Sequence, residues 1–306
     1  MSVPKPSVST DLLQVTHVTR YRYSKPVTFG RHRAMFRPHE SNDMRLTSFE
    51  VSANPAAAQH WVHDVFSNSK TILDFSSAPP SESLEITCTF NVVRSSVEVP
   101  VFPIALSAQR YPFDYPKEQI PDLIALIRPE YDHPEAAVNE WANALRRQAG
   151  DDTWSILTTI NSTIHETHVY KRREEPGIQK PRQTLELGEG SCRDFAILMI
   201  EAVRQLGFAA RFVTGYLYDP LTDQPGGMQG SGATHAWVQV FLPGAGWIEF
   251  DPTNGLIASG NLIRTGVART PSQAVPLDGS FHGDMNDFLG MEVDVNVTAL
   301  APTLKS

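Results

Sequence analysis

The fold class is decided by residues 235–251, whose sequence is HAWVQVFLPGAGWIEFD. Residues 235–242 and 246–251 are rich in β-branched and aromatic side chains, and the Pro243-Gly244 pair between them is typical of a turn. The two runs therefore predict an antiparallel hairpin. Because the expected helices precede these strands instead of alternating with them, the order indicates an α+β domain and not a parallel α/β sheet.

Three helices are expected before the hairpin. Apolar residues recur three and four positions apart, as on a helix with one buried face, over residues 134–145, 154–164 and 192–206. Pro134 suits the opening position of the first helix, and Gly207 suits the end of the third. We expect a polar loop over residues 171–182 and a further strand over residues 210–218.

The first hundred residues predict strands only. Residues 15–23 and 83–93 are rich in β-branched and aromatic side chains, and turn-forming residues separate such runs. From Leu84 to Val92 every second residue is apolar, which is the pattern of a strand with one buried face, so Cys88 points inward. We expect an all-β, sandwich-like domain, with a late strand over residues 291–297 returning to a sheet.

Composition limits the partners and the compartment. The 306 residues include 34 acids and 26 bases, and the net charge of -8 repels phosphate backbones and anionic lipid surfaces. Nucleic acid and membranes are therefore not expected partners. Cys88 and Cys192 allow one disulfide at most, and Pro4 and Pro6 interrupt the place where an export signal needs its apolar stretch. We expect a cytoplasmic protein, and the sequence does not predict its oligomeric state.

The segment GEGSCRD, residues 188–194, places a thiol at the start of the third helix. Ser191 suits the N-cap, and Asp194 three residues later completes a capping-box pattern. Cys192 is then the first helical residue, where the helix dipole and the neighbouring Arg193 favour the thiolate. For a cysteine considered alone, a buried structural role is the commoner interpretation.

An imidazole and a carboxylate lie at the open end of the predicted hairpin. His235 opens one strand and Asp251 closes the other, and the midpoint of their numbers is 243, at the predicted turn. They would be cross-strand neighbours, although a one-residue change of register would move one of them to the other face. A nucleophilic thiol needs a base and a group that orients the base, so Cys192, His235 and Asp251 are candidates for a catalytic triad. Considered singly, His235 suits the core and Asp251 suits a turn.

These residues belong to segments that resemble a known family, the bacterial transglutaminase-like proteins, relatives of the animal transglutaminases and, more distantly, of papain-like cysteine peptidases. The similar core segments are GSCRDFA at 190–196, GFAARFVTGY at 207–216, HAW at 235–237 and GWIEFDPT at 246–253. In the first half, YRYSKPV at 21–27 and DVFSN at 64–68 resemble the β domain of the bacterial group. Residues 267–277 depart from the family pattern, which weakens any carry-over of substrate contacts there.

The resemblance implies a papain/transglutaminase-like core, with helices packed on an antiparallel sheet, preceded by the all-β domain. We expect an N-terminal β domain over residues 1–110, a linker and helices over 111–150, a catalytic core over 151–270 and a C-terminal segment over 271–306. It also implies that Cys192 is the nucleophile, His235 the general base and acid, and Asp251 the orienting group.

The expected reaction is acyl transfer from an amide or isopeptide bond of a peptide or protein through a thioester. The enzyme would be a cysteine peptidase or amidase, or a protein-glutamine acyltransferase. Hydrolysis is slightly favoured, because water is always present whereas transfer needs a dedicated amine site. The alternative is a non-catalytic protein-interaction module with a relic core.

Neither a cofactor nor a metal is expected. His165 and His168, like His60 and His63, are three residues apart, whereas the zinc-peptidase helix motif needs a spacing of four. No acidic loop with calcium-ligand spacing occurs. The glycine-rich segment over residues 226–232 is interpreted as a flap over the thiol or, alternatively, as an inert linker.

Overall fold

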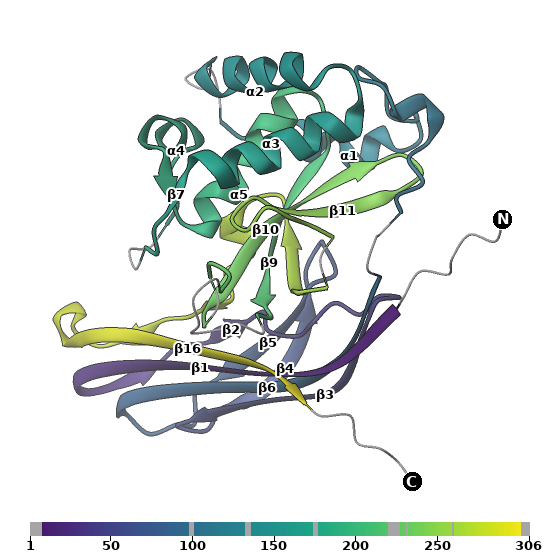
Figure 1. Cartoon of the computed structure of the whole chain (residues 1–306). Coiled ribbons are helices and arrows are strands. Elements are labelled where there is room, and N and C mark those ends of the chain that lie inside the picture. Colours follow the sequence, from purple (N-terminus) through teal and green to yellow (C-terminus); the bar gives the residue numbers. More distant parts are fainter. Residues whose placement is uncertain are drawn as a thin grey trace, which may run out of the picture.

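The computed structural model describes residues 8–97, 101–131, 136–173, 177–219, 227–230, 232–258 and 260–300. Helices gather at one end of the molecule, where they cover a sheet of short strands, and long strands form the opposite end (Figure 1). The architecture is the α+β class that the sequence predicts, with a strand-only first part followed by a core of helices and antiparallel strands.

The long strands belong to a β unit of two antiparallel sheets. One sheet has the order β15-β1-β6-β3 with β16 also paired to β1, and the other has the order β14-β2-β5-β4. The strands of the first sheet are β1 (Val8–Phe29), β3 (Met44–Asn54), β6 (Ser81–Val97), β15 (Phe281–His282) and β16 (Phe288–Leu300). Those of the second are β2 (His32–Ala34), β4 (Ala58–His63), β5 (Ser69–Asp74) and β14 (Leu277–Asp278).

Side chains from both sheets share one hydrophobic cluster, which gives the unit its sandwich-like character. Leu13 and Phe90 enter it from the first sheet and Leu73 from the second. The alternating residues Leu84, Ile86, Cys88, Phe90 and Val92 are all fully buried, as their spacing predicts. The late strand β16 pairs with β1 over nearly its whole length.

The second unit is a sheet with the order β12-β11-β10-β9-β13, covered by helices. Its strands are β9 (Ala210–Leu217), β10 (Thr234–Leu242), β11 (Gly246–Asp251), β12 (Leu256–Ile257) and β13 (Leu262–Ala268). The helices are α1 (Ile120–Ile127), α2 (Ala136–Ala149), α3 (Thr153–Thr167), α4 (Pro181–Leu187) and α5 (Cys192–Gln205). The short strands β7 (Val169–Tyr170) and β8 (Glu189–Gly190) form a parallel pair just before α5. Short 3-10 turns lie at Leu106–Ala108, Pro271–Gln273 and Met285–Asp287.

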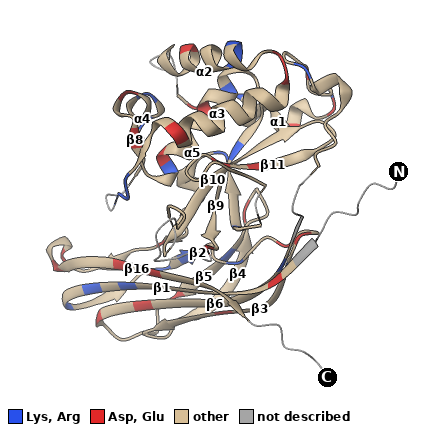
Figure 2. Ribbon diagram, viewed as in Figure 1, with Lys and Arg blue, Asp and Glu red and all other residues tan. Residues whose placement is uncertain are grey.

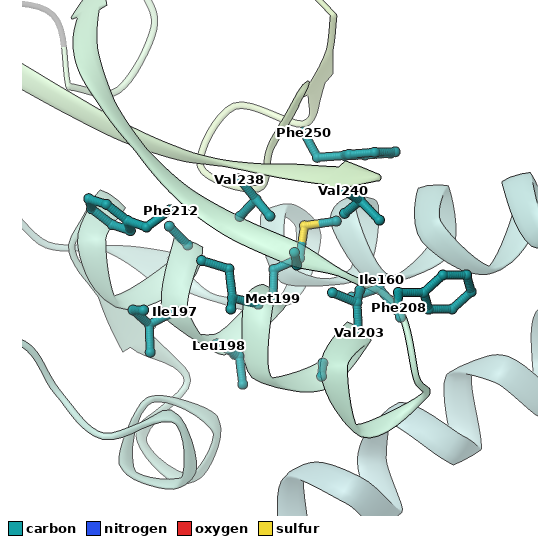
Figure 3. Close-up of a cluster of buried hydrophobic side chains, with 14 of the residues drawn as sticks. Ile160, Ile197, Leu198, Met199, Val203, Phe208, Phe212, Val238, Val240 and Phe250 are labelled. Carbon is teal, nitrogen blue, oxygen red and sulfur yellow. The ribbon is translucent and has the colours of Figure 1, made fainter. Parts of the chain in front are cut away.

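Helix α5 is the centre of this unit. Its side chains Met199 and Val203 pack beneath Val238 and Val240 of β10, and Phe250 of β11 closes the cluster (Figure 3). Each of these side chains is almost completely buried, which stabilises the fold by roughly 1.5–3 kcal/mol per large apolar side chain. The packing therefore fixes the cysteine-bearing helix against the strand that carries His235.

The predicted helices are present as α2, α3 and α5, although Pro134 lies outside the described residues. The structure adds two short helices that the apolar periodicity does not reveal, α1 and α4. Each has a proline in its first turn, Pro121 in α1 and Pro181 in α4, where the missing N–H costs no intrahelical bond. Helix α4 begins within the predicted polar loop over residues 171–182, because that proline starts a helix there and does not only interrupt the chain.

The two units contact each other through strands β9 and β13 of the second unit. Tyr216 and Ile263 from these strands are buried in the cluster of the β unit, and the Tyr216 hydroxyl forms a 2.9 Å hydrogen bond with Nδ1 of His17. Asn68, in the β4–β5 connection, donates to the Val267 carbonyl (2.7 Å) and accepts from its N–H (2.8 Å). The residue boundaries expected between the domains stay predictions.

Charges of both signs are interspersed over α2, α5 and the long strands (Figure 2). Among the described residues, no helix combines the length and the apolar character needed to span a bilayer.

Candidate active site

Cys192 is the first residue of α5, as the sequence predicts. The side-chain carboxylate of Asp194 accepts hydrogen bonds from the backbone N–H and the hydroxyl of Ser191, each at 2.8 Å, and so holds the first turn of the helix. A Cβ at Gly190 would lie 2.9 Å from the Asp194 Cβ, so only glycine lets the approaching strand pass this close. The Cys192 side chain is 7% exposed, which leaves the thiol at the edge of the core.

Asp194 also ties the preceding loop to the base of α5. Its fully buried carboxylate accepts from the Gln179 N–H at 2.7 Å and pairs with the Arg173 guanidinium at 3.3 Å. Because this carboxylate serves both the helix cap and the loop, the chain leading to the cysteine is fixed on two sides. The capping-box pattern noted in the sequence thus has a second structural role.

The register of the β10–β11 hairpin differs from the predicted one. Leu242 pairs with Gly246, which centres the turn on Gly244 and not on position 243. The turn contains residues 243–245, and Gly244 within it and Gly246, the first residue of β11, have positive φ values of 85° and 77°. His235 and Asp251 are therefore diagonal neighbours. They stay on one face because the register changes by two residues, and two residues are one full period of a strand.

His235 and Asp251 form a buried pair. The imidazole Nε2 and the carboxylate Oδ2 are 2.8 Å apart, and both side chains are fully inaccessible to solvent. Asp251 also accepts hydrogen bonds from the Thr253 N–H at 3.0 Å and the Asn254 amide at 2.9 Å. The carboxylate is thus held in one orientation by groups on the turn that follows β11.

Electrostatics in this pair favour the charged forms. Burial alone would lower the pKa of His235, but the Asp251 carboxylate and the Cys192 thiolate outweigh burial and raise it well above its ordinary value. Burial alone would raise the pKa of Asp251, and the imidazolium together with the Asn254 and Thr253 hydrogen bonds lowers it instead. Both shifts favour an imidazolium beside a carboxylate.

Cys192 is close enough to the imidazole to act on it. Cys192 raises the pKa of His235 through a side-chain hydrogen-bonding interaction and through its charge. Nδ1 of His235 has no hydrogen bond of regular geometry to any group of the described structure, so it is the nitrogen that is available to the sulfur. The structure thus brings together the three side chains that the sequence proposes as a triad.

Trp237 lines the imidazole. Its indole stacks on the His235 ring with centroids 5.9 Å apart and an angle of 25° between the planes, and it is fully buried. A nonpolar plane on this side keeps the ring in place and excludes water from the pair.

Tyr170, which no sequence motif marks, also lies near the site. It pairs with Gly190 across β7 and β8, two positions before the cysteine. Burial and the negative charges of Cys192 and Asp251 raise the pKa of Tyr170 to about 12, so the phenol stays protonated near the sulfur. Only the parallel pairing of two very short strands brings it here, and no motif or periodicity marks such a pairing.

The described part of the glycine-rich segment lies against the imidazole. Gly230 has a φ of 89°, and a Cβ added there would be 2.7 Å from Nδ1 of His235. The segment therefore covers the imidazole at this point and is not a remote linker, whereas residues 226 and 231 of the predicted flap lie outside the described residues.

His165 and the pair His60 and His63 have surroundings other than a metal site. Nδ1 of His165 bonds the Thr253 carbonyl at 2.9 Å and supports the turn after Asp251. His60 and His63 lie on the exposed strand β4. In the part of the chain that the structure describes, no three histidine, cysteine or acidic residues form a group able to hold a metal ion.

Comparisons with known proteins show which family models and relatives this chain matches. Residues 139–252 match the family model of the transglutaminase-like superfamily, and residues 13–93 match that of the bacterial transglutaminase-like N-terminal region. An uncharacterized protein of Mycobacterium tuberculosis (strain ATCC 25618 / H37Rv) is 29% identical over 305 residues, which cover 96% of this chain and 95% of the relative. An uncharacterized protein of Mycobacterium leprae (strain TN) is 23% identical, with 94% and 99% covered.

A solved structure shares the fold over nearly the full length. The protein described as "a Putative Cysteine Protease from Cytophaga hutchinsonii" superposes with a TM-score of 0.70 at 16% identity, over 98% of this chain and 94% of that one. The chain is therefore a bacterial transglutaminase-like protein, in which the N-terminal region of that group precedes a core of the transglutaminase-like superfamily.

Proposed function

We propose that this protein is a thiol enzyme that cleaves amide or isopeptide bonds of peptides or proteins by acyl transfer to Cys192. His235 is the general acid and base, and Asp251 orients and charges the imidazole. The observation that supports this most is the fully buried His235–Asp251 pair at 2.8 Å, next to a thiol at a helix N-terminus.

The reaction has two halves. The Cys192 thiolate attacks the carboxamide carbon, and the backbone N–H of Cys192, at the start of α5, stabilises the oxyanion that forms. His235 gives its proton to the departing amine, which leaves an acyl thioester on Cys192. Water then attacks the thioester while His235 takes up its proton, and the acid product and the thiolate are released.

Hydrolysis is proposed in preference to transfer, since water is always available and no dedicated amine site is identified. The proposed substrate is a peptide or protein, and neither a cofactor nor a metal takes part in these steps. Cys88 and Cys192 are free thiols, which agrees with the reducing cytoplasm that we propose as the compartment.

A library screen tests this function. Glutamine-containing and isopeptide-linked peptides are incubated with the protein, with and without an added amine, and mass spectrometry follows ammonia loss, cleavage and amine incorporation. We expect cleavage or deamidation that disappears in Cys192→Ala. Turnover retained by Cys192→Ala would place the chemistry elsewhere, and incorporation of amine in excess of hydrolysis would make the protein a transferase.

A further inference from the structure

The turn that follows β11 carries a side-chain amide that contacts two parts of the site. The Asn254 Nδ2 donates to Oδ2 of Asp251 at 2.9 Å and to the Gln229 carbonyl at 3.1 Å. Its Oδ1 accepts from the Gln229 N–H at 2.8 Å. One amide therefore pairs with the backbone of the glycine-rich segment in both directions, and it also holds the oxygen of Asp251 that bonds His235.

The segment held by Asn254 touches the imidazole one residue later. A Cβ at Gly230 would lie 2.7 Å from Nδ1 and 3.3 Å from Cε1 of His235, and the φ of 89° at this position also disfavours any other residue. The backbone at Gly230 therefore sets how much room is left at Nδ1, which is the nitrogen available to the Cys192 sulfur.

Both ends of this connection are hydrogen-bonded to other parts of the chain. On the segment, the Met228 N–H donates to the buried Asp219 carboxylate at 2.6 Å. On the turn, His165 of α3 bonds the Thr253 carbonyl at 2.9 Å. His165 of α3 holds the turn, and Asp219 holds the start of the segment. The Asn254 amide connects the two, so the position of the turn determines the position of the segment.

We propose that Asn254 is a positioning residue that locks residues 227–230 against the His235 imidazole and orients Asp251 with the same amide. This inference rests on the proposed function, because His235 and Asp251 are its acid–base pair. Asn254 does not touch the sulfur or the substrate in this account, and it acts by keeping the ring in line with Cys192.

Three variants test the lock, with iodoacetamide as the probe of the Cys192 thiolate. Asn254→Ala removes all three hydrogen bonds, and Gly230→Ala pushes the segment from the ring. Asn254→Asp keeps the shape of the side chain but, once ionised, repels the Asp251 carboxylate and the Gln229 carbonyl. Gln229→Ala is the matched control, because its side chain is exposed while the bonds to Asn254 use only its backbone.

The expected result is an alkylation rate of Cys192 that falls about tenfold or more in Asn254→Ala and Gly230→Ala and is unchanged in Gln229→Ala. For Asn254→Asp, the rate relative to the unmodified protein should be highest at pH 5, where a protonated carboxyl can still donate to Asp251, and should fall toward pH 8. In the described structure, the titratable groups that act on His235 are Cys192 on α5 and Asp251 on β11. Tyr170 on β7 interacts with these same two groups. A role in packing alone would not give this pH-dependent ratio.

Cys88 reports on folding within the same experiment, since it is fully buried and becomes labelled only when the β unit opens. If Asn254→Ala exposes Cys88, the isosteric Asn254→Asp decides the matter. Rates in Asn254→Asp that match the unmodified protein at every pH would overturn the inference. If the unmodified protein itself reacts no faster than free cysteine at pH 7, the proposed function fails, and this outcome is distinct from failure of the lock.

Discussion

The chain places its two cysteines in surroundings that differ in charge more than in burial. Cys88 lies on β6 inside the β sandwich and is fully buried, and burial raises the pKa of its thiol. Cys192 is almost as inaccessible, at 7% exposure, yet it begins a helix and faces an imidazole backed by a carboxylate. We infer that charged and dipolar partners, more than exposure, would make Cys192 the reactive thiol and leave Cys88 inert.

Removal of Cys192 and removal of Cys88 should have very different effects on turnover. Cys192→Ala should lower amide turnover by about 10⁴-fold or more, since the nucleophile is lost. Cys88→Ala should leave turnover unchanged and lower the stability, because it removes a buried side chain from the sandwich. Turnover assays paired with thermal melts measure both. Loss of turnover in folded Cys88→Ala would reverse the assignment of the two thiols.

The next effect concerns the group that orients the imidazole. Asp251→Asn keeps the size of the side chain but removes the charge that holds the pKa of His235 high. A loss of roughly 10⁴-fold in kcat is the order expected when such a carboxylate is neutralised. Steady-state kinetics at pH 7 check it, with Asp294→Asn on the exposed part of β16 as a matched control. Equal kinetics for both variants would remove Asp251 from the mechanism.

Tyr170→Phe tests whether the phenol near Cys192 contributes to turnover. The phenol is neutral and lies near the sulfur, so it is suited to donate a hydrogen bond to the oxyanion. Removing one such donor typically costs on the order of 10²–10³ in kcat, and we expect the lower end here. A thermal melt controls for packing. A reduced melting temperature with unchanged kcat would make Tyr170 a structural residue.

The smallest expected effect is a change in the free energy of unfolding with pH, and it comes from His17 in the β sandwich. Burial lowers the pKa of His17 to about 4, so the folded protein keeps this ring neutral while the unfolded chain is protonated below an ordinary pKa of about 6.5. The unfolded state then binds more protons, and stability falls as the pH drops from 7 to 5, by about 2 kcal/mol from this group. Urea unfolding at both pH values measures it. His17→Gln should remove this part of the loss, and an identical loss in that variant would refute the assignment.

Much of the fold follows from the sequence because its signals are local. The alternation from Leu84 to Val92, the apolar stripe of α5 and the cap at Ser191 are all set by residues within a few positions of one another. The short helices α1 and α4 escape notice because seven or eight residues are too few to show a period, and a proline in the first turn can equally mark a break.

The candidate site is less predictable, since part of it depends on long-range contacts. The side chains of Cys192, His235 and Asp251 are brought together as proposed, although the three-residue turn shifts the hairpin register by two. Tyr170 reaches the site through a two-residue parallel pairing. Asn254 depends on a hydrogen bond to a residue that lies 25 positions earlier in the chain, which no local pattern could reveal.

We propose that His235 stays protonated beside a Cys192 thiolate, and the pH dependence of Cys192 alkylation is the sharpest test of this state. Because Asp251 and the thiolate raise the pKa of His235, the imidazolium persists through neutral pH, and the iodoacetamide rate should change little between pH 6 and 8. Free cysteine measured alongside should speed up about tenfold per pH unit over that range. A Cys192 rate that rises in parallel with free cysteine would contradict the account.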